Sequence, residues 1–136
     1  MTLLALDVGS VRIGVADSDP GETFALPLSV IERTNVRDDL ERIVDLAQSY
    51  GAGEIVVGDP VRLNGERGLA SEKIDRFVEA LARRFTGSIH RVDERLTTAQ
   101  ATKALIGADV SRSRRKKVVD KVAASLILET FLARRR

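Results

Sequence analysis

The sequence of 136 residues contains no cysteine and no tryptophan, one histidine, one methionine and three prolines. Without cysteine, the chain can have no disulfide framework, no zinc site built from thiolates and no thiol nucleophile. No apolar run approaches the roughly 20 residues that a membrane-spanning helix needs. No signal-peptide pattern precedes the first strand-like segment. We therefore expect a cytoplasmic protein that has no membrane partner.

Aromatic residues are scarce as well, with four phenylalanines and one tyrosine. Proteins that bind single strands by base stacking present aromatic rings to the bases. Here Phe77, Phe85 and Phe131 fall on apolar helix faces instead, so base stacking is poorly supported. The only histidine, His90, lies inside a strand-like segment with no other ligand type beside it. We expect His90 to have a structural role.

The charge is unevenly distributed along the chain, although the net charge is only +2. Residues 103–136 contain ten Lys/Arg and three Asp/Glu, whereas residues 1–102 contain twelve and seventeen. A basic C-terminal third suits a polyphosphate partner such as nucleic acid. A solvated helix face would explain the same charges without a partner.

The segment that organises the chain is residues 3–16, LLALDVGSVRIGVA. It opens with a strand that is apolar on both faces, which is typical of a central strand. An acid such as Asp7 at the end of that strand is costly unless it is paired, hydrogen-bonded or bound to a metal. Gly14 removes a side chain where another element can approach closely. An ordinary hairpin in which Asp7 only caps the turn is the alternative.

The order of expected elements is three strands, then helix, strand, helix, strand, helix and helix. Strands are expected near residues 3–8, 13–16, 25–31, 54–58 and 89–92, and helices near residues 36–51, 74–87, 97–107 and 118–136, with a polar, basic connector at 109–117. The first three strands are joined by short turns, which favours an antiparallel meander. The last two follow helices and should be parallel additions through right-handed crossovers. We expect an α/β fold with a mixed five-stranded sheet and helices on both faces, in one domain over residues 1–136.

Four acids stand where sheet and helix ends should meet: Asp7, Asp93, Glu94 and Asp120. In α/β sheets, sites gather beyond the carboxyl ends of the strands. Crowded carboxylates repel one another and usually imply a hard divalent cation. Asp93 and Glu94 point to opposite faces on simple alternation, so one of them is expected at the site. Pairing of these two acids with neighbouring arginines is the alternative.

Four motifs carry a family resemblance: LDVGSVRIGVA at residues 6–16, IVVGDP at 55–60, DERLTT at 93–98 and DKVAASLIL at 120–128. Together, in this order, they resemble the YqgF/RuvX family of pre-16S rRNA nucleases, which are similar to Holliday junction resolvases. The resemblance covers nearly the whole chain. Asp17 and Asp59 depart from it, since apolar residues are more common at both positions.

The resemblance implies an RNase H-like fold and a carboxylate site formed by Asp7, Glu94 and Asp120, with Asp93 as the alternative to Glu94. It implies trimming of the 5′ end of precursor 16S rRNA, with junction resolution as the alternative function. One or two Mg²⁺ or Mn²⁺ ions would be the cofactors. Precursor rRNA, four-way DNA junctions and ribosomal particles would be the partners of a monomer or homodimer.

Basic residues should position the phosphate backbone of the nucleic acid. The candidates are Arg12, Arg62, Arg95, Arg112, Arg114, Arg115, Lys116 and Lys117. Two other functions stay open. Asp7 and the glycine-bearing hairpin also resemble the phosphate loop of actin-like phosphotransferases, and a non-catalytic RNA- or ribosome-binding module would retain the same acids as structural residues.

Overall fold

The computed structural model describes residues 2–62, 64–96 and 112–135. Its centre is a five-stranded sheet in the order β3-β2-β1-β4-β5. The strands are β1 (Thr2–Val8), β2 (Arg12–Ser18), β3 (Ala25–Glu32), β4 (Ala52–Asp59) and β5 (Ser88–Asp93). β1, β2 and β3 are antiparallel, whereas β4 and β5 run parallel to β1. This topology confirms the expected mixed sheet, with β1 as its central strand.

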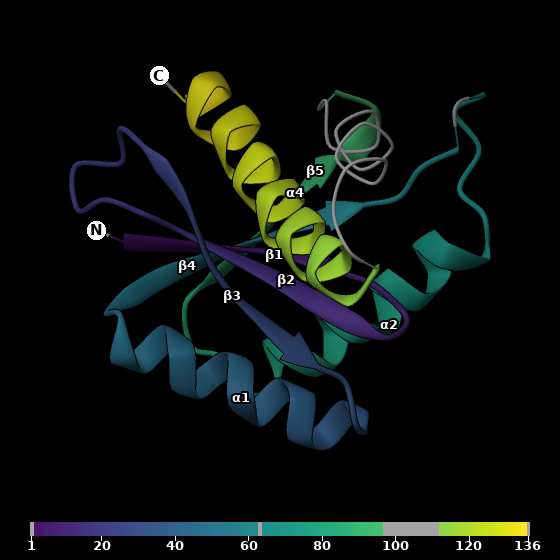
Figure 1. Ribbon diagram of the computed structural model, residues 1–136, viewed down its shortest axis with the longest axis horizontal. Helices are drawn as coiled ribbons and strands as arrows, with labels where there is room; N and C mark the ends of the chain where they lie inside the picture. The colour runs from purple at the N-terminus through teal and green to yellow at the C-terminus, as the bar shows by residue number, and fades with distance from the viewer. Residues whose placement is uncertain (1, 63, 97–111, 136) are drawn as a thin grey trace.

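Helices cover both faces of the sheet (Figure 1). The helical elements are α1 (Val36–Ser49), α2 (Leu69–Ala82), the short 3₁₀ turn η1 (Glu94–Leu96) and α4 (Arg112–Arg135). α1 and α2 pack on one face, and α4 crosses the other. No helix in the described ranges is both long and apolar enough to cross a membrane.

The alternation of β1 divides the core into two layers. Leu4 and Leu6 are buried against α1 and α2, whereas Leu3 and Ala5 are buried against α4. All four side chains are fully inaccessible to solvent. Because successive side chains of a strand point to opposite faces, Asp7 continues the row of Leu3 and Ala5 and belongs to the α4 face.

The edge strand and the first helix form as their sequences predict. β3 lies at the edge of the sheet, and its pairing with β2 shifts register next to Pro27, which has no amide hydrogen to donate to the ladder. α1 begins after Asn35, whose side chain accepts a 2.9 Å hydrogen bond from the amide of Asp38. This is the N-cap that the sequence predicts.

The expected basic connector at residues 109–117 is wrong for its second half. α4 begins at Arg112, so residues 112–117 form its first turns. Arginine and lysine are good helix formers, and a run of them favours a helix even without an apolar stripe. The helix expected at residues 97–107 lies outside the described residues. α2 ends at Ala82, one turn before the expected end near Gly87.

Candidate carboxylate site

Asp7 lies at the carboxyl end of the central strand on the face that α4 covers. Its residue is 6% exposed. In the antiparallel register, Asp7 is directly opposite Gly14 of β2. On the other side, the parallel strand β4 continues past Val57, the partner of Leu6, into Gly58. The carboxylate of Asp7 is therefore flanked by strands that carry no side chain at the neighbouring positions.

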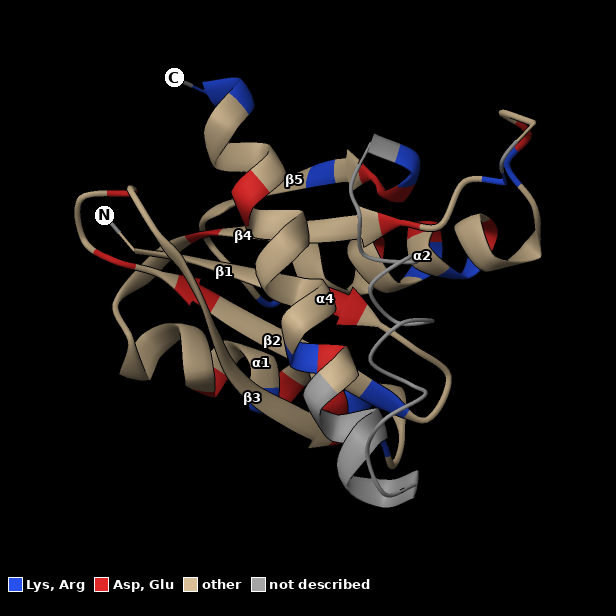
Figure 2. Ribbon diagram, turned by 45° about the horizontal axis from the view of Figure 1, so that its top comes forward, with Lys and Arg blue, Asp and Glu red and all other residues tan. Residues whose placement is uncertain are grey.

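Gly14 allows the backbone of α4 to lie directly on the sheet. A Cβ atom placed on Gly14 would overlap the carbonyl group of Asp120 and touch the amide of Lys121. The close approach expected from the sequence is therefore confirmed, and the approaching element is the helix that bears Asp120. Because Gly14 pairs with Asp7, this contact brings Asp120 next to Asp7. Figure 2 shows the acidic end of β1, in red, beside α4.

Gly58 has the same role for Glu94. A Cβ atom on Gly58 would lie 3.0 Å from Oε1 of Glu94 and 2.6 Å from Cδ1 of Ile127 on α4. Glu94 is the first residue of η1, and its residue is 7% exposed. The turn after β5 thus folds the Glu94 side chain back over the sheet, on the α4 face. Two glycines on the strands that flank β1 make room for two of the three acids.

Asp93 has a different environment from Glu94. Its carboxylate accepts hydrogen bonds from the Arg95 amide at 2.9 Å and from Nη2 of Arg95 at 2.6 Å. The hydrogen bond from the Arg95 side chain holds the pKa of Asp93 below its usual range. The structure therefore brings Glu94, and not Asp93, to the side of Gly58 that faces α4.

Arg12 is placed inside the acidic site. Its Nε donates a 3.1 Å hydrogen bond to Oδ2 of Asp120, and its Nη1 lies 3.8 Å from Oε2 of Glu32. The side chains of Arg12 and Asp120 are 17% and 22% exposed. Arg12 shares a face of β2 with Gly14, so it reaches Asp120 from the strand below. The arginine supplies a positive charge where several carboxylates converge.

The other predicted cations are spread around this end of the sheet. Arg62 is exposed on the loop between β4 and α2, and its guanidinium lies against Gly68. Arg95 is paired with Asp93. Arg112, Arg114, Arg115, Lys116 and Lys117 belong to the first turns of α4. The described geometry of Arg62 and Arg95 does not bring them into contact with the three acids.

The acids are suited to hard cations but are not arranged as a closed ligand set. Within the described ranges, no group of three or more His, Cys, Asp or Glu side chains is placed to hold a metal ion. Asp120 is instead engaged by Arg12. The donor chemistry nevertheless fits Mg²⁺ or Mn²⁺, which prefer carboxylate oxygens. The space above Gly14 and Gly58 fits a site to which three separate elements contribute.

Sequence reasoning missed a polar network that fixes the loop between β4 and α2. Asp59 is buried on the α2 face, where it accepts hydrogen bonds from Ser71 Oγ at 2.7 Å and from Arg67 Nη2 at 3.0 Å. Arg67 also binds Asp75, which in turn binds Arg91 of β5. The signal was the acid at position 59, where an apolar residue is expected. Asp59 anchors the loop that carries Arg62.

His90 has the structural surroundings that were expected. Its Nε2 lies 2.9 Å from Oε1 of Glu54, and its ring centroid lies 4.8 Å from that of Phe131. Arg135 makes two hydrogen bonds to the same Glu54 carboxylate. These contacts fasten the C-terminal end of α4 to β4 and β5.

Comparison with known proteins identifies the lineage of this site. The family model described as "RuvX: Holliday junction resolvase" matches residues 1–134. The chain belongs to the RuvX family. A relative from Desulforudis audaxviator, named "Putative pre-16S rRNA nuclease", is 45% identical over 136 residues, which is all of this chain and 96% of the relative. A relative of the same name from Thermoanaerobacter pseudethanolicus is 46% identical over 97% of this chain and 96% of its own.

Solved structures with low sequence identity show the same fold. RuvC from T. thermophilus in complex with a Holliday junction substrate matches with a TM-score of 0.61 at 14% identity, over 99% of this RuvX chain and 96% of RuvC. The fowlpox virus Holliday junction resolvase matches with a TM-score of 0.55 at 16% identity, over 98% and 99% of the two chains. The RNase H-like architecture expected from the sequence is therefore confirmed.

Proposed function

We propose that this RuvX protein is a metal-dependent endonuclease, in a single nuclease domain, that processes the 5′ end of precursor 16S rRNA. The observation that carries the proposal is the convergence of Asp7, Glu94 and Asp120 on the α4 face of the sheet, at Gly14 and Gly58. The names of relatives at 45% and 46% identity support the RNA substrate. Because that substrate is a newly made RNA, we also propose a cytoplasmic location and ribosomal particles as partners.

Asp7, Glu94 and Asp120 would hold one or two Mg²⁺ or Mn²⁺ ions. Bound ions of this kind activate water and stabilise the charge that develops on a phosphate and its leaving oxygen. The buried carboxylates of Asp7 and Glu94 provide fixed oxygen donors. Asp120 provides a third, at a point that Arg12 already neutralises. Arg12 is also within reach of a phosphate bound near Asp120, and would then help to orient it.

Contacts outside the acids would hold the backbone of the nucleic acid. Residues 112–117 carry five cations on the helix that leads into Asp120. Arg62 is exposed on a loop that the Asp59 network fixes to α2. Phosphate contacts of this type position the substrate without reading its sequence. The structure of the RNA would then select the cleavage site.

Junction resolution is the second candidate function. The description of the matching family model and the fold shared with a junction-bound RuvC favour it. A carboxylate site can hydrolyse phosphodiesters of either nucleic acid. The substrate is therefore decided by the binding surface, and both substrates have to be compared directly.

The test is a cleavage assay with purified protein, Mg²⁺ or Mn²⁺, a precursor 16S RNA that spans the mature 5′ end, and a four-way DNA junction. We expect metal-dependent RNA products that map to the 5′ leader and little cleavage of the junction. Asp7→Asn should abolish cleavage, whereas the matched variant Asp93→Asn should retain it. Symmetric junction products without RNA cleavage would replace rRNA processing by resolution. RNA binding without cleavage by the parent would favour the non-catalytic module.

A further inference from the structure

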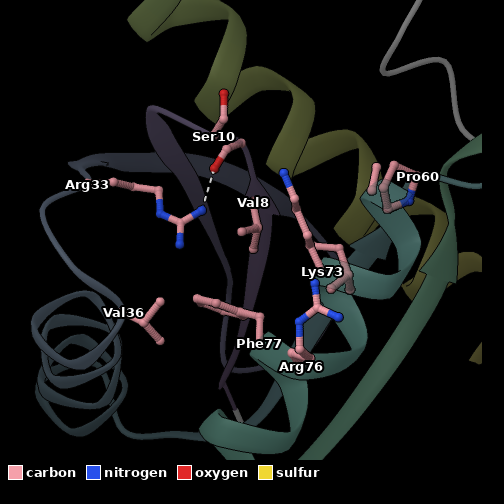
Figure 3. A pocket seen from close by; sticks show the side chains of 11 residues that line it. Val8, Ser10, Arg33, Val36, Pro60, Lys73, Arg76 and Phe77 are labelled. Atoms are coloured by element: carbon pink, nitrogen blue, oxygen red, sulfur yellow. Dashed lines mark hydrogen bonds between the residues drawn. The ribbon is translucent and has the colours of Figure 1, made fainter. Parts of the chain in front are cut away.

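A cavity of about 540 Å³ lies on the opposite face of the sheet from the acids (Figure 3). It is bounded by the end of β1 and the turn that follows, by the start of α1, by Pro60 after β4, and by one side of α2. The strand residue that lines it is Val8, which is adjacent to Asp7 in the chain and points the other way. The cavity and the carboxylate site therefore share one end of β1.

The lining combines apolar side chains with cations. Val8, Val36, Ile74 and Phe77 provide the apolar surface. The cations are Arg33, Lys73 and Arg76. Figure 3 shows Arg33 and Lys73 on either side of Val8, with Phe77 below them. Pockets of 300–1,000 Å³ with an apolar lining and a few polar groups are the usual form of small-molecule sites.

Arg33 is held rigidly at the rim. Its Nε donates to Oδ2 of the buried Asp39 at 3.1 Å, and its Nη1 donates to the Gly9 carbonyl at 2.7 Å. Its guanidinium carbon lies 5.7 Å from the centroid of the Phe77 ring. Asp39 balances the charge of Arg33, so Arg33 contributes a planar surface and hydrogen-bond donors rather than net charge.

Lys73 and Arg76 provide the uncompensated charge. Both residues are exposed on α2, and no described residue makes an ion pair or a side-chain hydrogen bond with either. The nearby acid Asp75 is already engaged by Arg67 and Arg91. The cavity thus has an apolar part next to two positive charges that are available for an anion.

We propose that this cavity binds a nucleotide, with the base against Val8, Val36 and Phe77 and the phosphate on Lys73 and Arg76. A nucleotide combines a flat, weakly polar ring with an anion, which matches the two parts of the lining. The proposal rests on the proposed function in one respect. A nucleic acid that places a phosphate at Asp7 passes the turn after β1, so a neighbouring unpaired nucleotide can enter the cavity. A free nucleotide has the same chemistry and is the second source.

The test is a binding measurement that does not require cleavage. 5′-AMP, 5′-CMP and a 5′-phosphorylated hexaribonucleotide are each titrated into ¹⁵N-labelled protein in EDTA, and amide chemical shifts are followed. We expect shifts at Val8, Ser10, Val36 and Ala70, and tighter binding of the hexamer if the source is the substrate. Binding of the mononucleotides as tight as that of the hexamer identifies a free nucleotide as the ligand.

Two double variants of α2 and its end make the test specific. Lys73→Gln with Arg76→Gln should weaken binding about three- to tenfold, the expected effect of losing two exposed charge contacts. Arg83→Gln with Arg84→Gln removes the same charge at the far end of the helix and should have little effect. Equal weakening by both pairs, or shifts confined to α4, would overturn the proposal.

The outcome is separable from that of the proposed function. Asp7→Asn should lose cleavage and keep nucleotide binding, because Asp7 faces the other side of the sheet. Nucleotide binding by a parent protein that cleaves no RNA would contradict the proposed nuclease and leave the cavity site intact. Cleavage by the parent without any shift at Val8 or Ala70 would contradict the cavity site alone.

Discussion

Gly14 and Asp120 are in contact through their backbones: the helix that carries Asp120 rests on the strand position that carries no side chain. The contact is 106 positions apart in the sequence, and it sets the distance between α4 and the central strand at the point where Asp7 lies. A single methyl group at this position therefore tests how the site is assembled.

Gly14→Ala should push the first half of α4 away from the sheet. Overpacking of this kind costs roughly 1–3 kcal/mol, which corresponds to several degrees in melting temperature for a domain of this size. Cleavage should fall more than stability, since Asp120 moves relative to Asp7. Gly21→Ala in an exposed turn is the control and should leave both nearly unchanged. A Gly14→Ala protein with parental stability and activity would show that the contact is not needed.

Arg12 should stabilise the site when no metal is present. Because Arg12 and Asp120 are only partly exposed, their ion pair should be worth about 1–2 kcal/mol, more than an exposed pair. Arg12→Gln should therefore lower the melting temperature in EDTA, and less so with saturating Mn²⁺. Arg37→Gln, which removes an exposed partner of Glu41, is the control. If Arg12→Gln weakens RNA binding and leaves the melting temperature in EDTA unchanged, its role is limited to the substrate.

The C-terminal end of α4 should loosen in acid. Hydrogen bonds from Arg135, and secondarily from His90, hold the pKa of Glu54 below its ordinary value of 4.5. A depressed carboxyl pKa contributes stability that is present above the unfolded-state pKa and lost as the pH falls through the folded-state value. The difference in unfolding free energy between the parent and Glu54→Gln, about 1 kcal/mol, should be constant above about pH 5.5 and shrink below 4.5.

Denaturant unfolding between pH 3.5 and 7 measures this difference. Glu129→Gln, an exposed change on the same helix, should show no comparable dependence on pH. A Glu54→Gln effect that is the same at every pH would mean that packing, and not the ion pairs, fastens α4.

The cations at the start of α4 should act on phosphates. Each phosphate contact that is lost lowers the slope of log affinity against log salt by roughly one unit. Replacing Arg114, Arg115 and Lys116 with alanine should therefore weaken RNA binding and reduce the slope by about two to three units, to a similar extent for different sequences. Binding measured by fluorescence anisotropy at several salt concentrations decides this. An unchanged slope would mean that these residues form only a solvated helix face.

Much of the fold could be predicted because local patterns matched the tertiary contacts. The two-sided apolar pattern of residues 3–8 predicts a buried central strand, and β1 is one. Gly14 predicts a close approach, although the sequence does not say which element approaches. The start of α4 was misplaced because residues 112–117 carry no apolar stripe and helix propensity alone had to be weighed.

The details of the site depended on geometry that no local pattern contains. Strand alternation separates Asp93 from Glu94 but does not say which faces α4, because the η1 turn sets that direction. The partnership of Arg12 with Asp120 joins a strand and a helix that are distant in sequence. The cavity draws Arg33, Lys73 and Val8 from three elements, and none of these residues is unusual in its own segment.

The central claim is that Asp7, Glu94 and Asp120 act together as a metal site. Without metal these carboxylates repel one another in a desolvated place, so removing one charge should offset the loss of its contacts by something on the order of 1 kcal/mol. With metal at a hundredfold excess over its dissociation constant, the parent should gain about 2.7 kcal/mol. Asp7→Asn removes a ligand and should gain much less, whereas Asp93→Asn should gain as much as the parent.

Melting temperatures of the parent and Asp7→Asn, each with EDTA and with Mn²⁺, test the claim most directly. We predict a crossing: Asp7→Asn melts at or above the parent in EDTA and clearly below it in Mn²⁺, with a difference of a few degrees. If Asp7 only caps the turn after β1, its replacement lowers both melting temperatures equally. Parallel losses in the two buffers would contradict the metal site.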